Sequence, residues 1–303
     1  MWETSTIHLQ QGSATLLQAI HGTGPRDACV IVYSGADIGR RYAIEGPCMV
    51  IGRTHEADAR LDSPGISRRH AELRQHGEQV LLRDLGSANG TFLNEVRLEA
   101  AAALKDGDLI RVGDVILKFY GRHSLDALLH DRIYRMATVD EGTGVHTKKY
   151  LLDALQREID LARRIGRPLA VMELDLDHFK SVNDRYGHNA GDEVLRLAAA
   201  AVKDTVRGTD VVGRVGGEEF AVVLPATELR AAVDLAERVR VAVAAREHEF
   251  KVPGEDRVET RHQTVSIGVA RWSAEMTQAR ELLGAADAML YAAKHGGRDR
   301  VAS

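Results

Sequence analysis

The sequence predicts two domains joined by a helix: an all-β sandwich, then an α+β domain whose central sheet contains antiparallel strands. The 303 residues are 44% hydrophobic, enough for two domains of about 150 residues each. Between residues 29 and 120, short apolar runs alternate with Gly, Asp and Asn turns, which is typical of a sandwich. Beyond Gly144, amphipathic segments of helical length alternate with apolar runs. We place a flexible N-terminal tail at 1–26, the sandwich at 27–121, the linker at 122–139 and the second domain at 140–303.

Composition limits the partners and the compartment. With 40 basic and 44 acidic residues, the net charge of -4 gives no general basic field for binding DNA or an anionic membrane non-specifically. No apolar run reaches the ~20 residues of a membrane helix, and the first residues lack a secretion signal, so we expect a cytoplasmic protein. Cys29 and Cys48 lie in strand-like runs and are predicted to be buried thiols rather than a disulfide or metal site.

The first domain carries polar clusters at the ends of its predicted strands. The strands are expected at 29–33, 48–51, 80–83, 109–112 and 115–120. The clusters are Gly52-Arg53, Ser67-Arg68-Arg69-His70 and Gly86-Ser87-Ala88-Asn89-Gly90-Thr91. Arg53 offers a charged fork and Ser67 a hydroxyl, which are the donors that a phosphate dianion needs. Taken alone, Asn89-Gly90 would indicate only a hairpin turn.

Together and in this order, these clusters resemble the forkhead-associated (FHA) phosphothreonine-binding domain over residues 27–121. The resemblance implies that Arg53, Ser67 and Arg68 hold the phosphate, that Asn89 fixes the ligand backbone, and that His70 braces the Ser67 loop from inside. Ala88 replaces a hydroxyl found in other members, so that contact is in question. The alternative is a remnant of the domain that only packs, but the cation and the hydroxyl are both retained.

The tail offers two candidate phosphorylation sites for a Ser/Thr kinase. Such domains often read an aliphatic residue three positions after the phosphothreonine, and Thr4 precedes Ile7 while Thr6 precedes Leu9 by that spacing. The tail is therefore a candidate ligand of its own FHA domain, in cis or across a dimer. The alternative is that both are ordinary threonines in a disordered tail.

The linker and the second domain follow a helical pattern and then a mixed one. Leu125, Leu128, Leu129, Ile133 and Met136 recur at helical spacing, which predicts a linker helix with one apolar face. Further helices are expected at 150–164, 192–206, 228–245 and 277–293, and strands at 169–174, 220–224 and 264–270.

Carboxylates gather at two places in the second domain. An apolar strand ends in Asp175 and Asp177, which alternation places on one face, and two glycines at 216 and 217 precede Glu218 and Glu219. Glycines at a tight turn let a bulky phosphate ligand approach the backbone. Oxygen ligands without Cys or His indicate Mg²⁺, which usually completes its coordination shell with nucleotide phosphates. An exposed acidic turn would explain either motif singly, but not both.

These motifs, with the signature Gly216-Gly217-Glu218-Glu219-Phe220, resemble the GGDEF domain of diguanylate cyclases over residues 140–303. The resemblance implies two Mg²⁺ ions, replaceable by Mn²⁺, held by Asp175, the Leu176 carbonyl and Glu218 against GTP. It further implies that Lys180, Lys294 and Arg298 neutralise the phosphates, that Gly216 and Gly217 admit them, and that Asn183 and Asp192 bind guanine. An ionised Asp192 accepts from both N1–H and the amine of guanine but not from adenine, which favours GTP.

The implied reaction joins two GTP molecules into cyclic di-GMP with release of two pyrophosphates, and it requires a homodimer because each domain binds one GTP. Glu218, Glu219 and Lys180 are the implied catalytic residues. Glu219 deprotonates or orients the 3′-hydroxyl, or instead shares a metal; the sequence leaves this open. The opening Asp140-Glu141-Gly142-Thr143-Gly144-Val145-His146-Thr147 lacks a Leu and an Asn common in the family, without loss of a chemical group.

A regulatory motif lies between these elements. Arg207 and Asp210 have the spacing of the family's Arg-x-x-Asp product-inhibition site, and Arg238 is a candidate second clamp from a neighbouring domain. A surface ion pair is the simpler explanation of Arg207 and Asp210. The other functions considered are a catalytically silent cyclic di-GMP receptor, against which the retained metal and substrate residues argue, and an FHA adaptor that recruits a kinase substrate.

Overall fold

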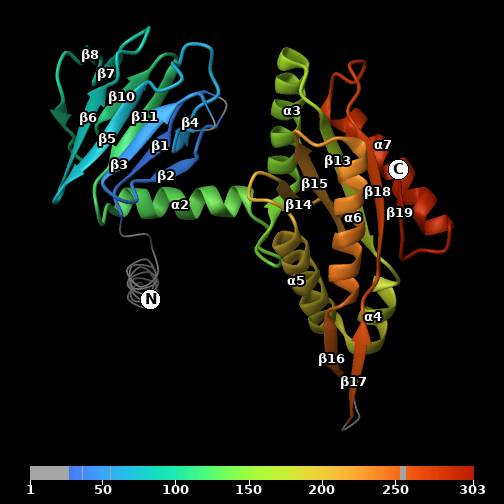
Figure 1. The fold of residues 1–303 in the computed structure, drawn as a ribbon. Coiled ribbons are helices and arrows are strands. Elements are labelled where there is room, and N and C mark those ends of the chain that lie inside the picture. Colours follow the sequence, from blue (N-terminus) through green and yellow to red (C-terminus); the bar gives the residue numbers. More distant parts are fainter. Residues whose placement is uncertain (1–26, 36, 55, 253–256) are drawn as a thin grey trace, which may run out of the picture. The chain divides into compact units, whose positions relative to one another are not determined.

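The computed structural model describes residues 27–35, 37–54, 56–252 and 257–303 (Figure 1). The chain divides into two compact units, with the boundary between Arg135 and Met136. Each unit has its own buried apolar core. The prediction of two structured parts joined near a helix is confirmed, and the units are described one at a time below.

The first unit is a sandwich of two sheets, as predicted. One sheet has the order β2 (Arg41–Ala43), β1 (Cys29–Val32), β11 (Val115–Tyr120), β10 (Leu109–Val112), β7 (Thr91–Leu93), β8 (Val96–Arg97). The other has the order β4 (Ala59–Arg60), β3 (Cys48–Gly52), β5 (Ala71–His76), β6 (Gln79–Asp84), β9 (Ala102–Ala103). Ile51, Leu73, Leu82, Ile110 and Leu117 are fully buried, as alternating strand residues that face a shared core should be. The loops at the strand ends are thereby held on a rigid scaffold.

Helix α2 (Leu125–Thr138) is the predicted linker helix. Its Ala127 packs with Cys29 and Tyr120 in a small cluster. Leu125, Leu129, Ile133 and Met136 are exposed, so much of the apolar face expected from the sequence is uncovered in a single chain.

Both cysteines are free thiols, as predicted. Cys29 is buried, but Cys48 is only partly buried, which corrects the expectation of two buried thiols. Cys48 begins strand β3, and its Sγ lies 3.7 Å from Glu72 Oε2. Partial burial and the adjacent carboxylate raise the pKa of the Cys48 thiol, so it is kept in its protonated form.

The second unit is an α+β domain around one mixed sheet. The strand order is β12 (His146–Thr147), β14 (Val211–Arg214), β15 (Glu219–Pro225), β13 (Leu169–Leu176), β18 (Val265–Arg271), β19 (Val301–Ala302). The two outermost pairs are parallel and the inner pairs are antiparallel, which confirms the predicted antiparallel-containing sheet.

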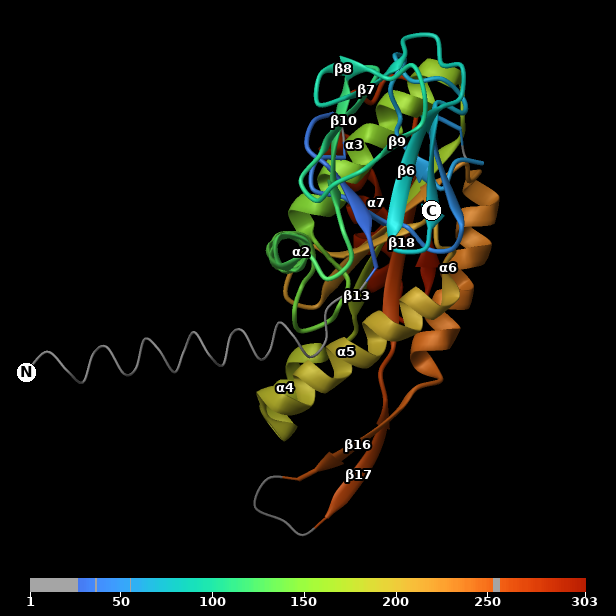
Figure 2. The ribbon, with the colours of Figure 1, turned by 90° about the vertical axis from the view of Figure 1, so that its left-hand side faces the viewer.

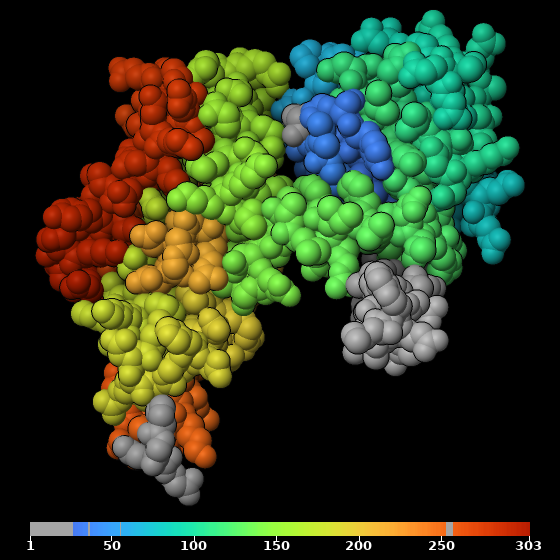
Figure 3. All heavy atoms as spheres, turned by 180° about the vertical axis from the view of Figure 1, so that it is seen from behind, coloured from blue at the N-terminus to red at the C-terminus, as the bar shows by residue number. Residues whose placement is uncertain are grey.

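Helices cover both faces of this sheet. On one face lie α3 (Lys148–Ile165) and α7 (Ala279–His295), which pack against each other; Figure 3 shows the red atoms of α7 beside the light green atoms of α3. On the other face lie α4 (Phe179–Tyr186), α5 (His188–Thr205) and α6 (Leu229–Ala244). A hairpin of β16 (Glu247–Lys251) and β17 (Val258–His262) extends from the end of the domain near α4 (Figure 2).

Strand β13 is the centre of the domain, because all eight of its residues are buried. Leu174 and Leu176 pack under α5 and α6, whereas Leu169 and Val171 pack under α3 and α7. A strand covered on both faces reads as a continuous apolar run, which explains why it was recognised in the sequence. The acidic residues at its end are therefore held by a rigid, fully packed element.

The predicted helices and strands differ from the observed ones mainly at their ends. The helix expected at 192–206 begins four residues earlier, at His188. Its N-cap, Gly187, has a φ of 85° and provides no side-chain cap, so the usual Ser, Thr or Asp start signal is absent. The two-turn helix α4 was not predicted, because eight residues are too few for a periodic pattern. Strand β14 and the β16–β17 hairpin were also missed.

Candidate functional site

The two acidic motifs of the second unit meet at the end of strand β13. Asp175 lies opposite Glu219 in the antiparallel β13–β15 pair, and the Leu176 N–H donates to the Glu218 carbonyl over 3.4 Å. The two glycines form the predicted turn between β14 and β15. A Cβ on Gly216 would lie 2.2 Å from Glu219 Oε2, so the Glu219 carboxylate lies over this glycine and would have to move if a side chain were added. The structure therefore places the main chain of Glu218 against that of Leu176, next to Asp175.

Lys294 is the charge partner of Asp175. Its Nζ, from the last turn of α7, lies 2.6 Å from Asp175 Oδ2. Burial raises the pKa of Asp175, and the bond from Lys294 offsets part of that effect. The carboxylate is thus buried but electrostatically compensated, and a cation that replaces Lys294 would meet the same need.

Asp177 has different partners although it shares the face of Asp175. Its carboxylate accepts hydrogen bonds from Thr264 Oγ1 at 2.8 Å, Ser266 Oγ at 2.7 Å and the Asp299 N–H at 3.1 Å. Arg298 and Asp299 both have positive φ angles, 61° and 43°, which cost energy for residues with side chains. Asp177 therefore acts on the loop that carries Arg298, and it is not available as a cation ligand without losing these bonds.

Glu173 is an acidic residue of the site that the sequence analysis missed. It is 7% exposed, and its Oε2 has no hydrogen-bond partner among the described residues. Burial, with the nearby charges of Asp287 and Glu219, raises the pKa of Glu173 to about 7. The available signal was a carboxylate that interrupts the otherwise apolar run at 169–174.

The predicted base-binding residues come from two adjacent helices. Asn183 lies on α4 and Asp192 on α5, and a Cβ on Gly191 would lie 2.0 Å from Asn183 Oδ1. Asn183 therefore contacts the helical turn that carries Asp192. Lys180 is exposed on α4, one helical turn before Asn183. Lys180 and Asn183 share a face of α4.

The donor set suits a magnesium nucleotide better than a protein-only metal centre. Among the described residues, no three His, Cys, Asp or Glu side chains converge closely enough to hold a metal ion. Mg²⁺ commonly binds through one or two carboxylates, with substrate phosphates completing its shell. Asp175 and Glu218 offer two such carboxylates on neighbouring segments.

The Arg-x-x-Asp motif forms the turn between α5 and β14. The Arg207 N–H donates to Asp210 Oδ2 over 2.9 Å, so this bond uses the Arg207 backbone while the side chain is exposed. Burial raises the pKa of Asp210, and the bond and charge of Arg207 oppose that effect. Arg238 is exposed on α6.

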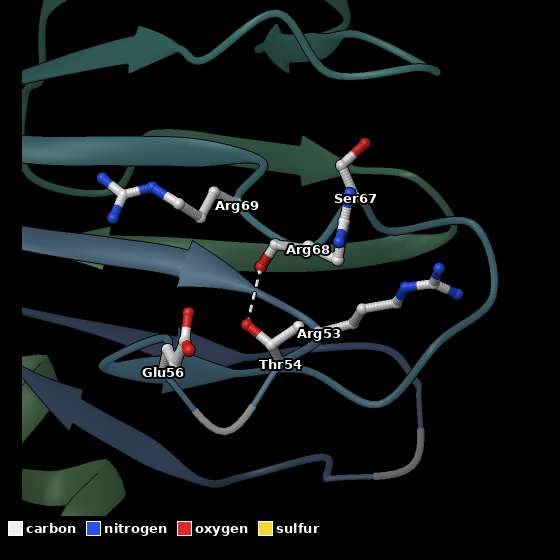
Figure 4. A pocket seen from close by; sticks show the side chains of 6 residues that line it. All are labelled: Arg53, Thr54, Glu56, Ser67, Arg68 and Arg69. Atoms are coloured by element: carbon white, nitrogen blue, oxygen red, sulfur yellow. Dashed lines mark hydrogen bonds between the residues drawn. The ribbon is translucent and has the colours of Figure 1, made fainter. Parts of the chain in front are cut away.

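In the first unit, the predicted phosphate-binding residues line one pocket (Figure 4). It has a volume of about 550 Å³ and is lined by Arg53, Thr54, Glu56, Ser67, Arg68 and Arg69. The two loops touch, since Thr54 Oγ1 donates to the Arg68 carbonyl over 3.2 Å. A Cβ on Gly52 would lie 2.1 Å from that same carbonyl, which explains the glycine before Arg53. Arg69, Thr54 and Glu56 were not among the predicted site residues.

Polar side chains, among them the buried His70, hold the pocket loops in place. His70 is fully buried; its Nδ1 accepts from the Ser67 N–H and its Nε2–H donates to the Gly90 carbonyl, both over 3.1 Å. These two partners require the neutral tautomer protonated at Nε2. Ser67 Oγ accepts from the Ala88 N–H, and the Asn89 amide donates to the Gly65 carbonyl. The candidate phosphosites Thr4 and Thr6 lie outside the described residues.

Comparison with known families decides the assignment of the second unit. The family model "Diguanylate cyclase, GGDEF domain" matches residues 137–300, which is more than half of the chain. The chain belongs to the GGDEF family. An FHA domain is also found, at residues 49–113, and it contains Arg53, Ser67 and Asn89.

Relatives of the GGDEF domain include both curated proteins and solved structures. The chain is 37% identical over 169 residues to the probable diguanylate cyclase DgcC of Escherichia coli K12, covering 56% of this chain and 44% of DgcC. It is 37% identical over 182 residues to the response regulator PleD of Caulobacter vibrioides, covering 60% of this chain and 38% of PleD. It thus spans less than half the length of either curated relative.

The solved GGDEF domain of DgcB from Caulobacter crescentus, in complex with c-di-GMP, is 34% identical with a TM-score of 0.51. The match covers 55% of this chain and 92% of that one.

Within the described part of the chain, no helix is long and apolar enough to cross a bilayer.

Proposed function

We propose that this GGDEF-family protein is a diguanylate cyclase that condenses two GTP molecules into cyclic di-GMP and two pyrophosphates. The observation that carries the proposal is the meeting of Asp175, Leu176 and Glu218 at the end of β13, with Lys294 reaching into the same place. The named cyclases among its relatives support the same activity.

GTP is held from three sides in this proposal. Asp192 accepts from N1–H and the amine of guanine, and Asn183 binds beside it. Lys180, Lys294 and Arg298 neutralise the triphosphate, and the Gly216-Gly217 turn lets the phosphates approach the backbone. Adenine would leave Asp192 without its donors, so the site selects GTP.

Two Mg²⁺ ions, or Mn²⁺ in their place, would be held by Asp175, the Leu176 carbonyl and Glu218. When bound, they supply charge stabilisation for the attacking and leaving oxygens of phosphoryl transfer. The protein's own contribution is the buried end of β13, which fixes the Asp175 carboxylate in advance. Glu219 is the candidate for orienting the 3′-hydroxyl or accepting its proton, because it lies directly opposite Asp175 and its carboxylate lies over Gly216.

Each domain presents one such site, so closing the cyclic product requires two chains whose sites face each other. A homodimer is therefore part of the proposal. Product inhibition is proposed at Arg207 and Asp210: the exposed guanidinium can bind the Hoogsteen edge of guanine or a phosphate, and Arg238 of a second domain would complete the clamp.

The FHA domain is proposed to regulate the cyclase by binding a phosphothreonine peptide at Arg53, Ser67, Arg68 and Asn89. A Ser/Thr kinase would create the ligand, in a partner protein or at Thr4 or Thr6 of the same protein. The pocket that combines the Arg53 and Ser67 loops supports this proposal.

The test is to incubate the full chain with GTP and Mg²⁺ and to separate the products by chromatography. We expect cyclic di-GMP from the wild-type chain and at least about 100-fold less from Glu218→Gln, because an amide cannot replace the charge of a metal-binding carboxylate. Chelation of the metal should also stop the reaction. Absence of cyclic di-GMP from the wild-type dimer, or full activity of Glu218→Gln, would refute the proposal.

A further inference from the structure

A small cavity lies between helix α4 and the β16–β17 hairpin, apart from the proposed GTP site. Its volume is about 160 Å³. Its polar lining includes His178, Ser181, His248, Arg261, His262 and Thr264. Figures 1 and 2 both show the hairpin next to the end of the domain where α4 lies.

The cavity faces a different side of α4 from the GTP site. His178, Ser181 and Val182 border the cavity. At 100° per residue, Lys180 and Asn183 project from the opposite side of this helix. The cavity is also smaller than the roughly 300 Å³ at which pockets for drug-sized ligands begin, so a nucleotide does not fit.

A buried imidazole in the cavity wall lacks a partner. His248 is 3% exposed, and its Nδ1 has no hydrogen-bond partner among the described residues. The imidazole ring of His248 stacks on the Phe250 ring with the ring centroids 5.8 Å apart, so packing fixes its orientation. A buried nitrogen without a partner destabilises the folded protein. An occupant of the cavity that bonds to Nδ1 would remove this cost.

The cavity lining contains an exposed cation, Arg261. Among the described residues, no carboxylate forms an ion pair with Arg261, whose guanidinium lies 5.6 Å from the centroid of the Tyr186 ring. The neighbouring Arg185 and Arg257, by contrast, are both paired with Glu259. The acidic group of the lining, Asp177, is already engaged by three hydrogen-bond donors. An anion would therefore meet an available cation in Arg261, and the other carboxylate whose charge reaches His248, Glu193, is paired with Arg196.

We propose that this cavity binds a small oxyanion of the phosphate class. Arg261 supplies the charge, the Ser181 hydroxyl supplies a donor, and His248 Nδ1–H completes the set by donating to an oxyanion oxygen. Oxyanion binding in this cavity does not depend on cyclase activity.

The test uses inorganic phosphate as the probe and the imidazole signals of the full chain, followed by ¹⁵N–¹H NMR. The His248 signal is assigned by its loss in His248→Gln. We expect it to shift and saturate as phosphate is added. Arg261→Gln removes the charge from an exposed side chain and should weaken this response about tenfold or more, which is 1.4 kcal/mol or more in binding free energy.

Arg53→Ala is the control, because it removes the phosphate candidate of the first unit and should leave the His248 response unchanged. A His248 signal that does not respond to phosphate would overturn the proposal. So would a response of equal affinity in Arg261→Gln, since the shift would then come from phosphate bound elsewhere. Neither result bears on whether the chain makes cyclic di-GMP, so the two proposals fail independently.

Discussion

The substitution Asp177→Asn tests how the site is built, because it changes one atom's chemistry while keeping the side chain's size. Asp177 is 5% exposed and accepts from Thr264, Ser266 and the Asp299 N–H. An amide keeps one acceptor oxygen and turns the other acceptor into a donor, so all three bonds weaken or must reorganise.

The expected cost follows from these three bonds. A hydrogen bond to a charged group contributes about 1.5–3 kcal/mol, and one between neutral groups about 0.5–1.5 kcal/mol. A loss of about 1 kcal/mol at each of two or three bonds predicts destabilisation by about 2–3 kcal/mol. Part of that loss falls on Arg298 and Asp299, whose positive φ angles the Asp177 bond helps to maintain.

Two measurements separate the structural effect from the effect on the site. Urea unfolding gives the loss of stability, and steady-state kinetics with GTP give KM and kcat. Because Asp177 is argued to position Arg298 and not to touch substrate, KM should rise about tenfold while kcat falls less. Asp184→Asn, an exposed carboxylate on α4, is the matched control and should change neither quantity. Unchanged stability and unchanged KM in Asp177→Asn would refute this reasoning.

Three further predictions concern the phosphopeptide pocket, base selection and pH. Arg53→Ala should weaken binding of a phosphothreonine peptide at least about tenfold by calorimetry, whereas Arg74→Ala, outside the pocket, should not; equal affinities would contradict the assignment. Asp192→Ala should reduce the preference in kcat/KM for GTP over ITP, which lacks the amine, and an unchanged preference would place guanine elsewhere. Burial raises the pKa of Asp84, but hydrogen bonds from Ser87, Thr91 and the Gly86 N–H lower it by more. The net pKa is therefore below the ordinary value of 3.8. Its stabilisation of the 86–91 loop is therefore present above pH 3.8 and lost as the pH falls through the lowered pKa. Asp84→Asn should speed amide exchange in that loop at neutral pH, and the difference from wild type should shrink in acid; a pH-independent difference would be inconsistent.

The sequence predicted the parts of the site that depend on local pattern. The strand ending at Leu176 was recognisable as an apolar run, and Gly216-Gly217 as a turn, because these signals depend on a few adjacent residues. Alternation also predicted one face for Asp175 and Asp177, and Ser266, the strand partner of Asp175, donates a hydrogen bond to Asp177. The pattern could not reveal that Lys294 pairs with one of them while Thr264 and Ser266 bind the other, since these partners come from distant segments.

The features that were missed depend on tertiary packing. Helix α4 is too short for its period to be read, and the hairpin that packs beside it carries an irregular mixture of charged and β-forming residues. Glu173 looked like one polar residue within an apolar strand; only the packing of α3 and α7 shows that it is buried without a partner. The same limitation applies to His248, whose missing partner is visible only once the cavity around it is formed.

The central claim is that Asp175 and Glu218 together hold divalent cations against the triphosphate of GTP. Mn²⁺ binding, followed by electron paramagnetic resonance in the presence and absence of a non-reactive GTP analogue, tests this claim most directly. We predict tight Mn²⁺ binding that requires the analogue, and at least about a hundredfold weaker binding in both Asp175→Asn and Glu218→Gln. Mn²⁺ binding that is independent of the analogue, or unaffected by either substitution, would contradict the account.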